Sequence, residues 1–139
     1  MTETASTNAD GPTAVVTVRP EAEVLTRQRL PYFVGICAAT AGARGLAMHL
    51  VVIPPGAASE PHLHRGYETA IYILEGRVET RYGRRLEHRV VNVAGDFVYI
   101  PADLPHQAVN LSATESARAL VARNDAADRE HVDPWQAPV

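Results

Sequence analysis

Short β-prone runs, each closed by proline or glycine, follow one another along most of this chain. Clear examples are residues 46–53 (LAMHLVVI), 67–74 (YETAIYIL) and 96–100 (DFVYI), and residues 77–82 alternate as a strand with one solvated face does. Ten prolines and nine glycines supply turns between the runs. No run has a convincing helical periodicity. The pattern therefore predicts an all-β barrel or sandwich.

The chain of 139 residues is long enough for one domain with a sizeable core. We predict a flexible N-terminal tail at residues 1–12, which are small and polar, and a barrel domain at residues 13–123 that begins with a β-branched run at 13–18. Residues 124–139 become charged and then proline-rich, which indicates a C-terminal tail or a segment that docks on a neighbour. Trp135, the only tryptophan, is expected to pack on the domain or on a second subunit.

Composition and charge argue against several classes of protein. The formal net charge of −3 favours no nucleic-acid partner, and no apolar run reaches the roughly 18–20 residues that a membrane-spanning helix needs. The N-terminus lacks the features of a signal peptide and Cys37 is the only cysteine, so we expect a cytoplasmic protein. Cys37 falls in a predicted strand at residues 32–38, where a small buried side chain is its expected role.

A histidine pair gives the strongest functional signal in the chain. His62 and His64 are two residues apart, so in an extended strand both imidazoles face the same side. Glu68 follows them, and His106 opens a later β-prone run. Three imidazoles with at most one carboxylate suit one divalent transition metal, Fe, Mn, Ni, Cu or Zn, with coordination positions left open for a small-molecule substrate.

Three further side chains are candidates for lining the pocket around such an ion, namely His49, Tyr72 and Tyr99. Each has an alternative role, because His49 also suits a hydrogen-bonded histidine elsewhere in the core or surface and the tyrosines suit core packing. Five arginines lie between residues 77 and 89. They attract an anionic substrate, or they form the solvated face of a hairpin whose charge is balanced by glutamates.

Both histidine segments resemble motifs of the cupin superfamily. The first motif, Gly-x5-His-x-His-x3–4-Glu-x6-Gly, is matched by Gly56, His62, His64, Glu68 and Gly76, with seven rather than six residues before the last glycine. The second, Gly-x5-Pro-x-Gly-x2-His-x3-Asn, is matched by Gly95, Pro101, His106 and Asn110, with Asp103 in place of the middle glycine. The resemblance implies a jelly-roll barrel, also called a double-stranded β-helix. It also implies one metal ion inside, held by His62, His64, Glu68 and His106, and a homodimer.

The additional residue after Glu68 leaves two registers open. An unbroken strand to Gly76 turns Glu68 outward and places Thr69 at the usual carboxylate position, leaving three histidines and water. A bulge or tight turn near Gly66 restores Glu68 as a ligand. The run HLHRGYETAIYILEG also resembles that of pirins, a cupin branch whose carboxylate ligand corresponds to Ala108 here and is therefore absent.

The resemblance leaves the reaction open, because cupins include dioxygenases, decarboxylases, isomerases, sugar-binding proteins and metal-free regulators. Our first hypothesis is a mononuclear metal-dependent enzyme that carries out an oxygen-dependent, dioxygenase-like conversion of a small organic molecule. Isomerisation or cyclisation at the same ion is the alternative reaction. A non-catalytic sensor or accessory protein that binds a small molecule or a metal is the alternative to an enzyme.

Overall fold

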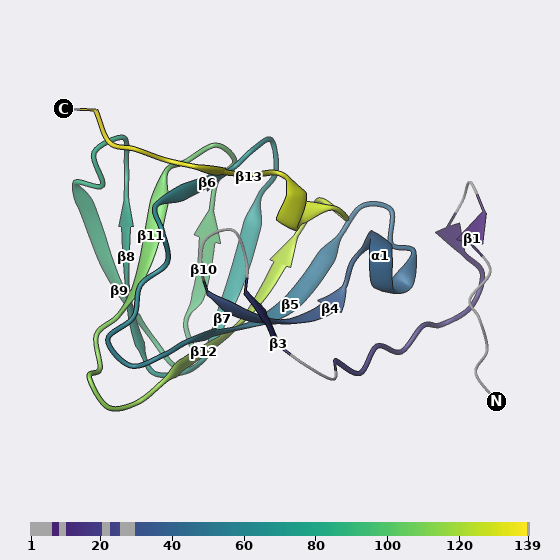
Figure 1. Cartoon of the computed structure of the whole chain (residues 1–139), viewed down its shortest axis with the longest axis horizontal. Helices are drawn as coiled ribbons and strands as arrows, with labels where there is room; N and C mark the ends of the chain where they lie inside the picture. The colour runs from purple at the N-terminus through teal and green to yellow at the C-terminus, as the bar shows by residue number, and fades with distance from the viewer. Residues whose placement is uncertain (1–6, 9–10, 21–22, 26–29, 139) are drawn as a thin grey trace.

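The computed structural model describes residues 7–8, 11–20, 23–25 and 30–138 (Figure 1). In these residues almost all regular structure is β, and neither of the two single-turn helices is long and apolar enough to cross a membrane. The elements in chain order are β1 (Thr7–Asn8), β2 (Gly11–Pro12), β3 (Glu23–Leu25), β4 (Pro31–Ile36), α1 (Ala38–Ala41), β5 (Ala47–Ile53), β6 (His62–His64), β7 (Thr69–Glu75), β8 (Arg77–Tyr82), β9 (His88–Val93), β10 (Phe97–Ile100), β11 (His106–Asn110), β12 (Ala117–Arg123), η1 (Asp128–Glu130) and β13 (Val132–Pro134).

Two antiparallel sheets make up the barrel. The larger has six strands in the order β10-β7-β12-β5-β4-β3, and the smaller has five in the order β13-β6-β11-β8-β9. Consecutive strands pair in β3-β4, β4-β5 and β8-β9, whereas other neighbours come from distant parts of the chain, as in the pairing of β12 with both β5 and β7. The prediction of an all-β barrel is confirmed, and most predicted strand boundaries agree with the observed ones to within two residues.

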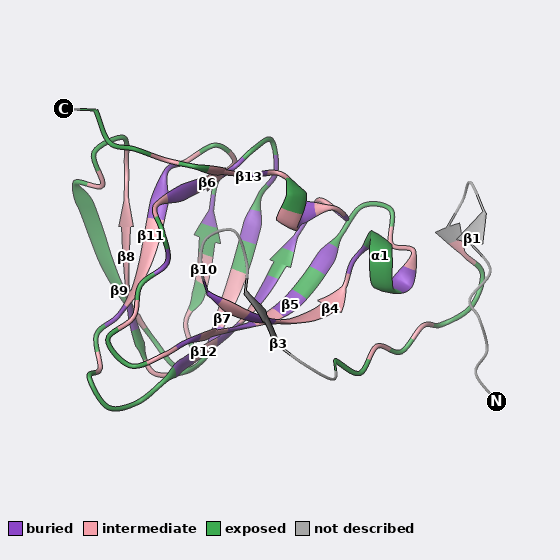
Figure 2. Cartoon of the chain, in the orientation of Figure 1, coloured by how far each residue is buried: buried purple, intermediate pink, exposed green. Residues whose placement is uncertain are grey.

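Alternation along the strands places the core between the sheets (Figure 2). In β5 every second residue from Ala47 to Ile53 is buried, and in β12 the same holds from Ala117 to Arg123. Val51 and Ile53 of β5 and the apolar members of the β12 set pack with Ile73 of β7 and Val78 of β8 in one cluster that joins the two sheets. Polar side chains that share this inward face, among them His49 and Arg123, are consequently withdrawn from solvent.

The segment at residues 13–18 is not the strand that we predicted. It belongs to neither sheet (Figure 1): Val15 is 97% exposed, and Val18 only lies beside residues of β4 and β5. In the described part of the chain no strand pairs with its β-branched residues, so intrinsic preference alone does not produce a sheet. Of the predicted N-terminal tail, Thr7–Asn8 pairs with Gly11–Pro12, and the remaining residues lie outside the described part of the chain.

Cys37 is buried, as predicted, but it ends the strand rather than lying within it. It caps α1 at a turn where its backbone N–H donates to the Thr40 hydroxyl at 3.0 Å.

The C-terminal segment contacts the barrel of its own chain. The strand β13 pairs with β6 along the residues that carry the histidine pair, and Asp128 of η1 is only 1% exposed. The Trp135 backbone N–H donates to the Pro61 carbonyl at 2.9 Å, and its indole N–H donates to the Arg84 carbonyl at 2.8 Å. Of the two alternatives for Trp135, the structure therefore shows packing on the same domain.

Candidate metal centre

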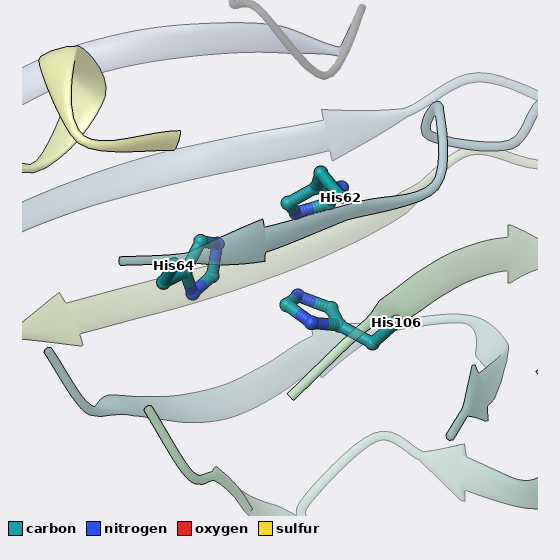
Figure 3. Close-up of side chains that lie close together, drawn as sticks. All are labelled: His62, His64 and His106. Atoms are coloured by element: carbon teal, nitrogen blue, oxygen red, sulfur yellow. The ribbon is translucent and has the colours of Figure 1, made fainter. Parts of the chain in front are cut away.

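Three histidines from two strands of the smaller sheet converge inside the barrel (Figure 3). His62 and His64 share the inward face of β6, and His106 opens β11 in register with His62. The ring centroids are 5.1 Å apart for His62 and His64, 4.4 Å for His62 and His106, and 4.7 Å for His64 and His106. One ring nitrogen from each lies within 4.8 Å of the others, and all three residues are at most 5% exposed.

Each imidazole is held through its Nδ1 atom. His62 Nδ1 lies 2.6 Å from the Glu60 carbonyl oxygen and His106 Nδ1 lies 2.8 Å from that of Leu104. A carbonyl oxygen only accepts, so both Nδ1 atoms carry the hydrogen and both Nε2 atoms keep a free lone pair. His64 Nδ1 lies 2.8 Å from the Thr69 hydroxyl, and its Nε2 is buried without a hydrogen-bond partner among the described residues.

The electrostatic surroundings keep the three rings neutral. Burial, with the neighbouring His106, lowers the pKa of His62 to about 3, and burial lowers that of His106 to about 4. Burial, together with the Arg123 charge, holds the pKa of His64 well below its usual range. Three unprotonated nitrogens that face one another, one without a partner, form a donor set that a divalent transition ion satisfies. The residues present therefore fit a metal.

The turn at Asp103 fixes the C-terminal end of the strand that carries the histidine pair. Asp103, at the position where the cupin motif has glycine, adopts the left-handed conformation with φ of 63°. Its backbone N–H donates to the His64 carbonyl at 2.9 Å, and its side chain accepts from the Gly66 N–H at 2.9 Å. Aspartate tolerates this backbone better than most residues do, and its carboxylate adds a contact that glycine lacks.

Glu68, predicted as a fourth ligand, does not join the three histidines. Its side chain is exposed and accepts a hydrogen bond from the Tyr99 hydroxyl at 2.8 Å, while its backbone N–H donates to the Asn124 side chain. Tyr67 and Thr69 on either side are buried, so the alternation runs through Glu68 without a bulge. The unbroken register was the correct alternative, and Thr69 is the inward residue, with its hydroxyl at His64 Nδ1 rather than on the Nε2 side where a metal ligand would lie.

The three predicted pocket-lining residues also lie elsewhere. Tyr72 and Tyr99 are on the outer face of the larger sheet. Side chains alternate along a strand, and the interior is lined by their chain neighbours, Ile71 and Ile73 in β7 and Val98 and Ile100 in β10. His49 points inward but into a separate cluster, where it accepts from the Gly35 N–H at 3.0 Å and contacts Asp128 at 3.1 Å. This is the hydrogen-bonded core role that was its alternative.

The histidines line one end of a cavity of about 60 Å³ between the sheets, enough for a few water molecules or a small organic group. Aliphatic side chains form most of its wall, and Ser59, Thr80 and Arg123 are polar members. Tyr67 stacks on His64 with ring centroids 5.1 Å apart and donates its hydroxyl to the Asp128 carbonyl at 2.7 Å. Sequence reasoning missed Arg123 and Asp128; the buried alternation of β12 was the available signal for Arg123.

Comparison with known proteins agrees with this geometry. A cupin-domain family model matches residues 49–123. Among solved structures, a cupin 2 conserved barrel domain protein from Salinispora arenicola is 27% identical with a TM-score of 0.65, and the match covers 84% of this chain and 95% of that one. A polyketide cyclase from Streptomyces resistomycificus is 21% identical with a TM-score of 0.63, and the match covers 96% of this chain and 85% of that one.

A sugar phosphate isomerase from Silicibacter pomeroyi is 25% identical with a TM-score of 0.54, and the match covers 67% of this chain. This chain spans less than two-thirds of the length of several such neighbours, 59% for the isomerase. No curated protein sequence matches the chain. The family match covers more than half of the chain, and the barrel and both histidine motifs are present. The chain therefore belongs to the cupin family.

Proposed function

We propose that this chain is a mononuclear metal-dependent enzyme that acts on a compact organic molecule. The observation that carries the proposal is the convergence of three buried, neutral imidazoles whose Nδ1 atoms are engaged and whose Nε2 atoms face one another. His62, His64 and His106 would hold the ion. When bound there, a divalent ion supplies a Lewis acid that polarises a substrate oxygen and lowers the pKa of a coordinated water.

The protein's own residues orient the ligands and exclude water. The Glu60 and Leu104 carbonyls and the Thr69 hydroxyl hold the rings. Loss of one such hydrogen-bond partner typically lowers metal affinity roughly tenfold to a hundredfold. Tyr67 covers one face of His64, and the aliphatic wall removes bulk water from the cavity. A cavity of about 60 Å³ favours a compact substrate.

The ligand set favours Lewis-acid chemistry, which here means isomerisation or cyclisation. It favours this chemistry over the oxygen-dependent conversion that was our first hypothesis. Non-haem iron oxygenases commonly use two histidines and one carboxylate, whereas Glu68 is turned away from this site. The 25% identical structural neighbour described as a sugar phosphate isomerase supports the non-oxidative class. A carbonyl compound able to enolise, such as a small 1,3-diketone, is the substrate type that this chemistry serves.

Metal content tests the centre directly. Wild type, His106→Ala and Glu68→Gln are purified without chelators or a histidine tag and analysed by elemental mass spectrometry. We expect close to one transition ion per chain in wild type and Glu68→Gln, and strong loss in His106→Ala. Equal metal content in wild type and His106→Ala refutes the centre.

Turnover then tests the reaction class. Anaerobic conversion of a 1,3-diketone or hydroxy-carbonyl compound, followed by NMR, supports isomerisation or cyclisation. Oxygen uptake that depends on the substrate supports the dioxygenase-like alternative. Saturable binding without product supports the non-catalytic sensor.

A further inference from the structure

One charged side chain lies inside the barrel with the three histidines. Arg123 is the last residue of β12, shares the inward face of that strand with Val121, and lines the same cavity as His62, His64 and His106. Its side chain is only 4% exposed. The chain thus maintains a permanent positive charge in an otherwise apolar interior, which is costly unless the guanidinium is paired.

Two of its three nitrogens have partners. Nη1 donates to Asp128 Oδ2 at 2.9 Å, and Nη2 donates to the Tyr32 hydroxyl at 2.7 Å. Nε is buried and has no hydrogen-bond partner among the described residues. A buried N–H of a charged group that is left without an acceptor is unusual in a native fold. An acceptor that enters the cavity gives it one.

The partner of Arg123 is itself held in place. Asp128 is 1% exposed, and its second oxygen lies 3.1 Å from His49 Nε2. Because the Gly35 N–H donates to His49 Nδ1, His49 Nε2 carries the hydrogen and donates to Asp128. Asp128 therefore balances one positive charge, and it comes from the C-terminal segment, beyond the residues 49–123 that the family model matches.

The cavity offers no negative charge of its own. The residues found along its wall include three neutral histidines and Arg123 but no aspartate or glutamate from the described part of the chain. With Arg123 balanced by Asp128, both charges of a divalent ion at the three histidines face an apolar cavity without compensation. A ligand that supplies negative charge at an oxygen is favoured there over a neutral one of equal size.

We infer that the cavity selects a small organic anion, and that Arg123 binds a charged oxygen of that anion through Nε–H while Asp128 positions the guanidinium. This inference deepens the proposed function and rests on it for the metal ion; the contribution of Arg123 does not depend on the ion. The geometry makes Arg123 a specificity-determining residue and gives the C-terminal segment a role in the site.

The test compares acetate with its neutral isostere acetamide by isothermal titration calorimetry. Each is titrated into the full-length chain, metal-free and after loading with one equivalent of Zn²⁺, and zinc binding is measured first. Arg123→Lys retains the charge, but its three donors radiate from one nitrogen instead of a planar fork, so they cannot reach Asp128, Tyr32 and a ligand together. Arg118→Lys is the matched control, since Arg118 lies on the same strand and is 42% exposed at its side chain.

We expect wild type to bind acetate more tightly than acetamide, and Arg123→Lys to lose about tenfold or more in acetate affinity. Zinc affinity, acetamide binding and the Arg118→Lys variant should be unchanged. Zinc binding with an acetate affinity that Arg123→Lys leaves unchanged overturns the inference and leaves the proposed function standing.

Two further results remain decisive. If zinc does not bind, the proposed function fails; acetate binding to the metal-free chain that Arg123→Lys abolishes then still supports the inference, and its absence overturns it. If Arg123→Lys does not fold, the double variant Arg123→Met with Asp128→Asn removes both buried charges together, which preserves neutrality. An acetate affinity in the folded double variant that equals that of wild type also overturns the inference.

Discussion

Acid should destabilise the metal-free chain steeply, because three buried histidines stay neutral in the fold. The folded-state pKa is about 3 for His62 and about 4 for His106, and that of His64 is also far below its usual range. In the unfolded chain each is about 6.5. Between about pH 4 and 6.5 the unfolded state therefore binds more protons, so the free energy of unfolding falls as the pH falls.

The magnitude follows from the proton count. Each histidine kept neutral costs about 1.36 kcal/mol of stability per pH unit below about 6.5. At pH 5 this amounts to about 2 kcal/mol for each and about 6 kcal/mol for the three, which matches the lower end of the roughly 5–15 kcal/mol stability of a domain. His106→Ala removes one of the three protons, so the limiting slope should fall from about 4 to about 2.7 kcal/mol per pH unit.

Urea unfolding followed by circular dichroism from pH 5 to 7.5, with a chelator present, measures this slope. His88→Ala controls for the loss of an imidazole, because the side chain of His88 is 60% exposed. A wild-type slope below that of two protons, or a slope that His106→Ala leaves unchanged, would falsify the reasoning. Added metal should raise the free energy of unfolding by a similar amount across this range, since the folded rings are unprotonated throughout it and are ready to bind the ion.

Further predictions concern the residues around the site. Thr69→Val removes the hydroxyl at His64 Nδ1 and should weaken metal affinity by roughly tenfold to a hundredfold in calorimetry, while an unchanged affinity contradicts the orienting role. Asn110→Ala removes an amide that donates to three backbone carbonyls and should cost roughly 2–4 kcal/mol in urea unfolding; a loss under about 1 kcal/mol contradicts it. Asp103→Ala retains the left-handed strain but loses the contact to Gly66, so it should lower stability by about 1–2 kcal/mol; Asp103→Gly, which relieves the strain, should lower it less.

The barrel and the histidine cluster were predictable for different reasons. Alternation and turn residues predict the strands, and spacing alone puts His62 and His64 on one face of β6. The position of His106 opposite His62 depends on which distant strands pair, which no local pattern contains. The motif resemblance supplied that information, and its departure at Asp103 has a physical explanation, since this residue takes the left-handed backbone for which glycine is normally chosen.

The misplaced pocket residues have two different origins, one in strand faces and one in a distant partner. Ile71 and Ile73 surround Tyr72, and Val98 and Ile100 surround Tyr99, so period-two alternation with the aliphatic residues inward places both tyrosines outside. His49 obeys the alternation and is buried, but its partner Asp128 comes from a segment nearly eighty residues later, which no local pattern predicts.

One residue of register decides the charge of this site. Had the strand bulged after Gly66, Glu68 would have faced the histidines and cancelled one charge of a divalent ion. The unbroken strand instead presents Thr69, which orients His64 without adding charge. Both the anion preference assigned to Arg123 and the preference for Lewis-acid over oxygen chemistry rest on that missing carboxylate. Glutamate at position 69 should therefore weaken both together, because it restores a negative charge at the position where the structure has a hydroxyl.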